Sequence, residues 1–187
     1  MEAISKKHSY SSDILKKARS VRLLVLDVDG VLTDGGIVYT QEGVQVQGFH
    51  VRDGLGIKLL AINNIETAII SARKSKAVEK RCFELGIRHV FQAASNKLAC
   101  LSALLMELGI DHENVCAMGD DWVDLPLLKR CGFSVTVRDG ASFMADHVDY
   151  VTKAPGGRGA VREVCELILY AKGLLEKSFS LYLNPTA

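Results

Sequence analysis

The chain has 187 residues, of which 48% are hydrophobic and 24% charged, so its composition excludes a disordered protein and suits one domain spanning 1–187. Lys and Arg number 23 against 22 Asp and Glu, a net charge of +1, whereas a general nucleic-acid binder carries a basic excess; we expect no nucleic-acid partner. The sequence has no apolar run near the roughly 20 residues that span a bilayer, which predicts no membrane partner.

Residues 1–20 form a polar, basic leader that lacks the apolar stretch of a secretory signal, with a short helix expected over Asp13–Arg19. The five cysteines are odd in number and form no CxxC pair. This pattern argues against a disulfide framework or a structural zinc site. We therefore expect a protein of the reducing cytoplasm.

Short apolar runs alternate with helical patterns after the leader. Such runs are typical of central strands covered on both faces, and they predict strands over Leu23–Leu26, Thr67–Ile70, Val115–Met118 and Phe133–Val137. Helical periodicity predicts helices over Ser75–Leu85, Asn96–Leu108 and Val161–Leu175. The alternation predicts an α/β fold: a Rossmann-like parallel sheet with helices on both faces.

Two segments depart from this alternation. Residues Gly36–Val51 alternate apolar and polar side chains around a Gln-Glu-Gly turn, which predicts an inserted β-hairpin. The C-terminal tail, Ser178–Ala187, is expected to be flexible in an isolated chain.

Two acids, Asp27 and Asp29, directly follow the first apolar strand. Ligands of open parallel sheets bind at the carboxyl ends of the strands, and alternate residues share a face, so both acids can point at one centre. Paired carboxylates repel each other unless a cation offsets their charge, and Mg²⁺ suits oxygen ligands. The alternative is a solvated acidic turn without a ligand.

A second acidic cluster follows the strand that begins at Val115. Asp120 leaves the strand end as Asp27 does, and we expect it to be a metal ligand. Asp121 and Asp124 fall in the first turn of the next helix, where acids orient a metal's surroundings or simply cap the helix. Both interpretations stay open for these two residues.

Polar side chains also occur between the two acidic clusters. Some follow the predicted strand Thr67–Ile70, and one lies at the start of the predicted helix Asn96–Leu108. Ser71 and Arg73 come just after a strand, and Lys97 opens the next helix. A single Ser or Lys at such a place is usually a cap or a surface charge. The order of the set is the informative feature: acid pair, hydroxyl, ammonium and acid cluster at successive strand ends or helix starts.

This order and spacing resemble the haloacid dehalogenase superfamily of phosphotransferases, in its small branch without a cap domain. The resemblance runs from about Ala18 to Leu175 and is closest to the phosphatases of 3-deoxy-D-manno-octulosonate 8-phosphate (KDO 8-phosphate). It rests on the segments LLVLDVDGVLTDG, FHVRDGLGIKLL, AIISARKSKAVEKRC, SNKL, GDD and GGRGAVREVCELIL. One departure is Ser71-Ala72-Arg73, where the family usually has Thr-Gly-Arg; the alanine could crowd that loop.

The resemblance implies a role for each motif residue. Asp27 is the nucleophile that forms an aspartyl-phosphate, and Asp29 is the general acid and then the base. Mg²⁺ is held by the side chains of Asp27 and Asp120 and by the backbone carbonyl of Asp29. Two further implied roles are phosphoryl binding by Ser71 and Lys97, and orientation of the metal's surroundings by Asp124.

The implied activity is Mg²⁺-dependent hydrolysis of KDO 8-phosphate to KDO, a lipopolysaccharide precursor. Arg73, Arg81 and Arg158 are the candidates for binding the acidic sugar, since a guanidinium matches a carboxylate. The family also implies a homotetramer joined through the hairpins, in which a neighbouring subunit covers each site. We assign no role to Asp121, and we expect Arg52 and Asp53 to border the pocket.

Two other functions remain open from the sequence. One is a sibling phosphatase acting on nine-carbon substrates, such as N-acylneuraminate 9-phosphate or its deaminated analogue KDN 9-phosphate. The other is a non-catalytic oligomerisation module, since related domains occur fused to cytidylyltransferases. The presence of Asp27 and Lys97 argues against the second, because an inactive module would often have lost them.

Overall fold

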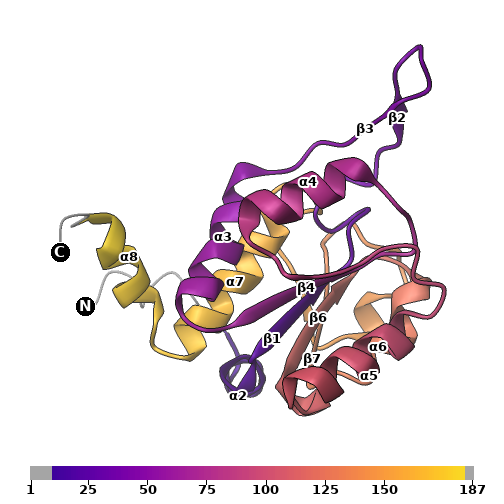
Figure 1. Ribbon diagram of the computed structural model, residues 1–187. Helices are drawn as coiled ribbons and strands as arrows, with labels where there is room; N and C mark the ends of the chain where they lie inside the picture. Colours follow the sequence, from indigo (N-terminus) through magenta and orange to yellow (C-terminus); the bar gives the residue numbers. More distant parts are fainter. Residues whose placement is uncertain (1–9, 184–187) are drawn as a thin grey trace.

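The computed structural model describes residues 10–183, in which a parallel sheet lies between two layers of helices (Figure 1). The sheet has six strands in the order β5-β4-β1-β6-β7-β8, and each neighbouring pair is parallel. The strands are β1 (Leu23–Leu26), β4 (Glu66–Ile70), β5 (His89–Phe91), β6 (Val115–Gly119), β7 (Phe133–Thr136) and β8 (Tyr150–Val151). The predicted Rossmann-like α/β fold is confirmed.

The helices form one layer on each face of the sheet. One layer holds α2 (Ser12–Ser20), α3 (Val51–Ile62), α4 (Lys76–Leu85) and α7 (Ala160–Ala171). The other holds α5 (Lys97–Leu108) and α6 (Leu125–Leu128). Three short 3₁₀ helices cover His112–Asn114, Trp122–Asp124 and Ala145–His147. None of the helices between residues 10 and 183 is long and apolar enough to cross a membrane.

Strand β1 is buried on both faces because its side chains alternate between the two cores. Leu24 and Leu26 pack in the core with α3 and α7, whereas Leu23 and Val25 pack in the core with α5. The strand is paired with β4 on one side and β6 on the other. The residue that follows β1, Asp27, is therefore held by the most constrained part of the sheet.

The sheet changes winding direction next to β1. From β1 the chain proceeds to β4 and β5 on one side, and then returns to β6 on the other. The loops that leave β1 and β6 therefore diverge, which opens a crevice at the carboxyl ends of these strands. Asp27 and Asp120 directly follow the two strands and so lie at this crevice.

The predicted hairpin is present but short. Strands β2 (Val38–Tyr39) and β3 (Gln45–Val46) pair antiparallel and project away from the sheet (Figure 1). Thr40 and Val44 close the turn through a backbone hydrogen bond of 2.9 Å. Val51, which the prediction placed at the end of the hairpin, instead begins α3.

The structure corrects the predicted C-terminal region. Helix α7 ends at Ala171 rather than Leu175, because Gly173 adopts a positive φ of 71° and breaks the helix. The tail from Ser178, predicted to be flexible, continues a further helix, α8 (Leu175–Leu183). The hydroxyl of Ser178 is buried and accepts a hydrogen bond from Asn63, which attaches α8 to the end of α3. The leader residues 1–9 and the last four residues lie outside the described part.

Candidate active site

The residues predicted to carry the chemistry line one open pocket at the carboxyl ends of β1, β4 and β6. Asp27, Asp29, Ser71, Arg73, Lys97 and Asp120 all contribute to its wall. The pocket has a volume of about 250 Å³. Pockets that bury most of a small-molecule ligand usually measure roughly 300–1,000 Å³, so this one is small for a site that encloses its ligand.

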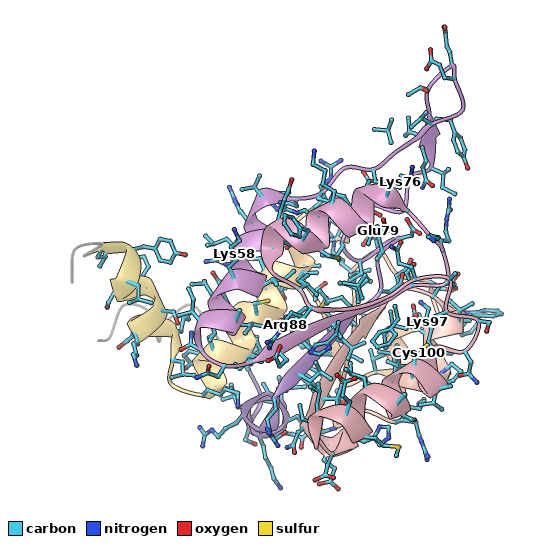
Figure 2. All side chains as sticks on the ribbon, viewed as in Figure 1. Lys58, Lys76, Glu79, Arg88, Lys97 and Cys100 are labelled. Carbon is cyan, nitrogen blue, oxygen red and sulfur yellow. The ribbon has the colours of Figure 1, made fainter. Side chains whose placement is uncertain are left out.

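Lys97 lies between two buried carboxylates. It begins α5 (labelled in Figure 2), and its Nζ lies 2.6 Å from Asp27 Oδ1 and 2.6 Å from Asp124 Oδ1. Burial alone would lower the pKa of Lys97, but the two carboxylates reverse the direction and raise it. The ammonium is therefore charged, and it fixes the orientation of the Asp27 carboxylate.

The carboxylates outnumber the cation at this place. Ligand oxygens of Asp27, Asp120 and Asp124 lie within 4.8 Å of one another. Burial and repulsion by Asp124 raise the pKa of Asp27 to about 6. Burial and repulsion by Asp27 raise the pKa of Asp120 to about 7. Three crowded hard oxygen donors with one ammonium leave uncompensated negative charge, so the donor set fits a divalent cation such as Mg²⁺.

Gly30 makes room for this cluster. Its φ is +87°, and a Cβ atom at this position would lie 2.0 Å from Asp120 Oδ2. Any other residue would therefore meet both backbone strain and a clash with the proposed metal ligand. The glycine of the Asp-Val-Asp-Gly motif thus leaves room for the Asp120 carboxylate beside the backbone of the loop after β1.

The open question about Asp121 and Asp124 is partly resolved by their hydrogen bonds. The two residues form a capping box around the 3₁₀ helix Trp122–Asp124. Asp124 also uses Oδ2 to accept the N–H of Asp120 at 3.1 Å, and Oδ1 to accept from Lys97. Asp124 therefore both caps the helix and connects Lys97 to the Asp120 loop. Asp121 caps the helix and lies on the pocket wall.

Ser71 and Arg73 are held by backbone hydrogen bonds to the end of β5 and to the loop that follows it. The backbone of Ser71 bonds to Phe91 and to Ala94, and its hydroxyl accepts the N–H of Arg73 at 3.2 Å. Among the described residues other than glycine, a positive φ occurs at Asn64 and Ala93, so Ala72 fits this loop without that strain. The departure from the usual Thr-Gly-Arg pattern is tolerated by the backbone.

Asp29 has partners that the sequence reasoning missed. Gln47 Nε2 donates to Asp29 Oδ1 at 3.0 Å, and Arg73 Nε lies 3.7 Å from Asp29 Oδ2. The neighbouring glutamine, Gln45, accepts a hydrogen bond from Arg73 at 3.2 Å. The alternation Val-Gln-Val-Gln at residues 44–47 was the available signal, since it places both amides on one face of a strand.

Two predicted substrate residues lie outside the pocket of their own chain. Arg81 bonds to Glu84 at 3.3 Å on α4, and its guanidinium packs against Gly54 of α3. Arg158 is exposed and forms an ion pair of 3.2 Å with Asp34. Neither side chain lines the pocket that holds Asp27.

Arg52 and Asp53 lie at a different place from the one expected. Asp53 is buried and accepts the N–H groups of Gly159 and Arg162, so it caps the start of α7 from α3. Arg52 lines a second surface pocket together with Arg158. Neither residue contributes to the wall of the Asp27 pocket, and Asp53 has a structural role instead.

Known proteins are similar to this chain in both sequence and fold. Residues 84–163 match the family model for haloacid dehalogenase-like hydrolases. The 3-deoxy-D-manno-octulosonate 8-phosphate phosphatase of Escherichia coli K12 is 49% identical over 168 residues, 90% of this chain and 89% of that protein.

Solved structures agree with the sequence comparison. That of the 3-deoxy-D-manno-octulosonate 8-phosphate phosphatase from Moraxella catarrhalis, in complex with magnesium, phosphate and KDO, has a TM-score of 0.90 at 40% identity, covering 92% of this chain and 99% of that one. The cobalt-bound deoxy-D-mannose-octulosonate 8-phosphate phosphatase from Haemophilus influenzae has a TM-score of 0.84 at 37% identity, covering 88% of this chain and 99% of that one.

The fold and the acid–lysine site define a hydrolase of the haloacid dehalogenase superfamily. Within it, the chain belongs to the family of the 3-deoxy-D-manno-octulosonate 8-phosphate phosphatases.

Proposed function

We propose that this chain is a Mg²⁺-dependent phosphatase that hydrolyses KDO 8-phosphate to KDO and inorganic phosphate, a step that supplies lipopolysaccharide synthesis. The observation that carries the proposal is the cluster of Asp27, Lys97 and Asp120 beside Asp29, in a chain 49% identical to a KDO 8-phosphate phosphatase. A solved relative of the same name holds magnesium, phosphate and KDO together.

The side chains of Asp27 and Asp120 and the backbone carbonyl of Asp29 would hold Mg²⁺, which when bound neutralises the phosphate and the nucleophile. A carboxylate oxygen of Asp27 attacks phosphorus, and the bond from phosphorus to the sugar oxygen breaks. Asp29 gives its proton to that oxygen, so the sugar leaves as an alcohol. Lys97 holds Asp27 in place through the 2.6 Å bond and offers its charge to the phosphoryl oxygens.

The second half of the reaction frees Asp27. Asp29, now ionised, accepts a proton from a water molecule, and the resulting hydroxide oxygen attacks phosphorus of the aspartyl-phosphate. The acyl-phosphate bond breaks and Asp27 returns as a carboxylate. Ser71, which lines the pocket just after β4, would bind the phosphoryl group together with Lys97.

We assign binding of the sugar carboxylate to arginine side chains. Arg73 is on the pocket wall, 3.7 Å from Asp29, and so can contact the sugar next to the reacting oxygen. Arg81 and Arg158 lie away from that wall, so they can serve a site only in another copy of the chain. Their assignment as substrate residues therefore depends on assembly.

The assembly we propose is a homotetramer joined through the hairpins. The hairpin exposes apolar side chains, namely Val38, Tyr39, Val44 and Val46, that a second copy could cover. The incompletely enclosed pocket also needs a cover if water is to be excluded during phosphoryl transfer. We place the proposed tetramer in the cytoplasm, since five cysteines without a CxxC pair suit a reducing compartment.

The test is phosphate release from KDO 8-phosphate and N-acetylneuraminate 9-phosphate, measured side by side with Mg²⁺ and with excess EDTA. We expect EDTA-sensitive turnover that favours the eight-carbon substrate. Preference for the nine-carbon substrate would keep the mechanism and overturn the specificity given to Arg73. Turnover of neither substrate, in a preparation that is folded and Mg²⁺-loaded, would contradict the proposed function.

A further inference from the structure

The hairpin reaches back into the active site through Gln47. This side chain comes from the residue after β3 and lies between Asp29 and Ser75. Gln47 Nε2 is 3.0 Å from Asp29 Oδ1, and Ser75 Oγ is 2.5 Å from Gln47 Oε1. Gln47 is half-buried, whereas its neighbours along the chain, Val46 and Gly48, are exposed. The side chain therefore spans the gap between the hairpin and the body of the protein.

The orientation of the Gln47 amide is fixed at both ends. An amide nitrogen can only donate hydrogen bonds, and Gln47 Nε2 donates to Asp29 Oδ1. The Oε1 atom then faces Ser75, whose hydroxyl donates to it. Ser75 is itself held in place, since it is the N-cap of α4 and accepts the N–H of Ala77 at 3.2 Å. A continuous chain of hydrogen bonds thus runs from the start of α4 through Gln47 to Asp29.

We propose that Gln47 is a positioning residue for Asp29, and that it directs the carboxyl group of the general acid toward the leaving oxygen. The inference rests on the proposed function, because it takes Asp29 as the acid. Gln47 occupies Oδ1, which leaves Oδ2, on the side of Arg73, as the oxygen that exchanges the proton. The hairpin therefore acts within its own chain's active site in addition to its proposed role in assembly.

A positioning role has a chemical consequence that a merely structural role lacks. When the sugar leaves, the phosphorus–oxygen bond breaks and Asp29 transfers its proton to the alkoxide oxygen, which departs as an alcohol. The 4-nitrophenolate of p-nitrophenyl phosphate is a weak base and departs without that proton. Misplacing the acid should therefore slow the first reaction and spare the second.

The experiment compares kcat/KM of wild type and Gln47→Met for KDO 8-phosphate and for p-nitrophenyl phosphate at saturating Mg²⁺. This parameter reports the steps up to departure of the leaving group, so the later hydrolysis of the aspartyl-phosphate does not enter. Methionine has a similar length and no charge, and it cannot donate to Asp29. The matched control is Gln41→Met, the same change at an exposed residue in the hairpin turn.

We expect Gln47→Met to lower kcat/KM for KDO 8-phosphate by about tenfold or more, part of the roughly 10²–10⁴-fold that acid–base catalysis supplies. The value for p-nitrophenyl phosphate should change less than about twofold, and Gln41→Met should change neither. Equal losses for both substrates, or no loss for either, would overturn the proposal.

Failure of the proposed function would appear separately, in the wild type. If wild-type protein does not hydrolyse KDO 8-phosphate, the proposed substrate is wrong. The contrast can then be measured with whichever alkyl phosphate the wild type does hydrolyse. A Gln47→Met loss that is confined to that substrate would still support the positioning role.

Discussion

The first strand of the sheet and the hairpin that follows it bury their side chains in opposite ways. All four residues of β1 are at most 2% exposed, and both faces of the strand pack against helices of the same chain. In the hairpin the polar Gln45 and Gln47 turn inward to the site, while Val44 and Val46 remain 59% and 48% exposed. One chain is thus sufficient to build the catalytic centre. Its hairpin has packing partners only on the face toward that centre, and the outer face is exposed.

This difference separates two kinds of contribution to activity. The end of β1 supplies the reacting groups, so changes there should abolish turnover without disturbing assembly. The outer face of the hairpin supplies no reacting group, so changes there should act through assembly. The variants below test that separation.

The largest effect is expected at the end of β1, from Asp27→Asn. The amide cannot attack phosphorus, so kcat should fall by at least about 10⁴-fold, as it does when other enzymes lose their nucleophile. Because burial and Asp124 raise the pKa of Asp27 to about 6, ionising this residue opposes folding at neutral pH, and removing the charge should stabilise the protein by about 1 kcal/mol. Steady-state assays and thermal unfolding at pH 7.5 would measure both. A large fall in the melting temperature would contradict this account of the site.

The second effect concerns the outer face of the hairpin. The double variant Val44→Asp, Val46→Asp should dissociate the proposed tetramer, because it buries two unpaired charges at the interface. Activity should fall by about tenfold or more as the site loses its cover, and light scattering after size-exclusion chromatography would report the assembly. The control is Gln41→Asp in the turn. A tetramer that resists the double variant would show that this face is not the interface.

A third effect separates charge recognition from catalysis at Arg73. Replacing this residue with Ala should raise KM for KDO 8-phosphate by about tenfold, since a charge-assisted hydrogen bond contributes roughly 1.5–3 kcal/mol. KM for a neutral sugar phosphate should change much less. Because Arg73 also contacts Gln45, circular dichroism should confirm that the variant is folded. Equal rises in KM for both substrates would show that Arg73 does not recognise the sugar carboxylate.

Metal removal should have a pH-dependent effect on stability. The pKa values of Asp27 and Asp120 are raised to about 6 and about 7, so the folded metal-free protein binds more protons than the unfolded chain. Its stability should therefore fall as the pH rises from about 4 to about 7. Mg²⁺ binds the ionised carboxylates, so the melting-temperature difference between Mg²⁺ and EDTA should grow from pH 5 to pH 8. Asp120→Asn should reduce the increase of this melting-temperature difference with pH. A melting-temperature difference that does not depend on pH would contradict the assignment of the metal ligands.

The sequence predicted the central part of the sheet well because burial on both faces produces continuous apolar runs. Strand β1 was predicted with its observed bounds, and β4, β6 and β7 differ by one residue at one end. The edge strands β5 and β8 were missed, since they have three and two residues and lack such runs. The residues around Asp27 were found because each follows a predicted strand or opens a predicted helix.

Helix α3 was not predicted, because two glycines that are needed for its packing obscure the helical pattern of its sequence. Gly54 and Gly56 weaken the helical pattern of residues 51–62. The reason for Gly56 is visible only in three dimensions: a Cβ atom there would lie 3.2 Å from Arg162 Cα of α7. The contact of Gln47 with Asp29 was missed for a similar reason, because it depends on how the hairpin folds back over the site.

The smallest predicted effect lies at the junction of α3 and α8. Asn63 donates to Leu59 O at 2.8 Å and to the buried Ser178 Oγ at 2.9 Å, so Asn63→Ala should destabilise the protein by about 1 kcal/mol. The melting temperature should fall by about 2–4 °C, with kcat unchanged, because the junction does not line the pocket. The control is Lys177→Ala on the exposed side of α8, which should change neither quantity. Equal melting temperatures for the two variants would mean that α8 is not attached through Asn63, and that the flexible tail predicted from the sequence describes the protein better than the docked helix.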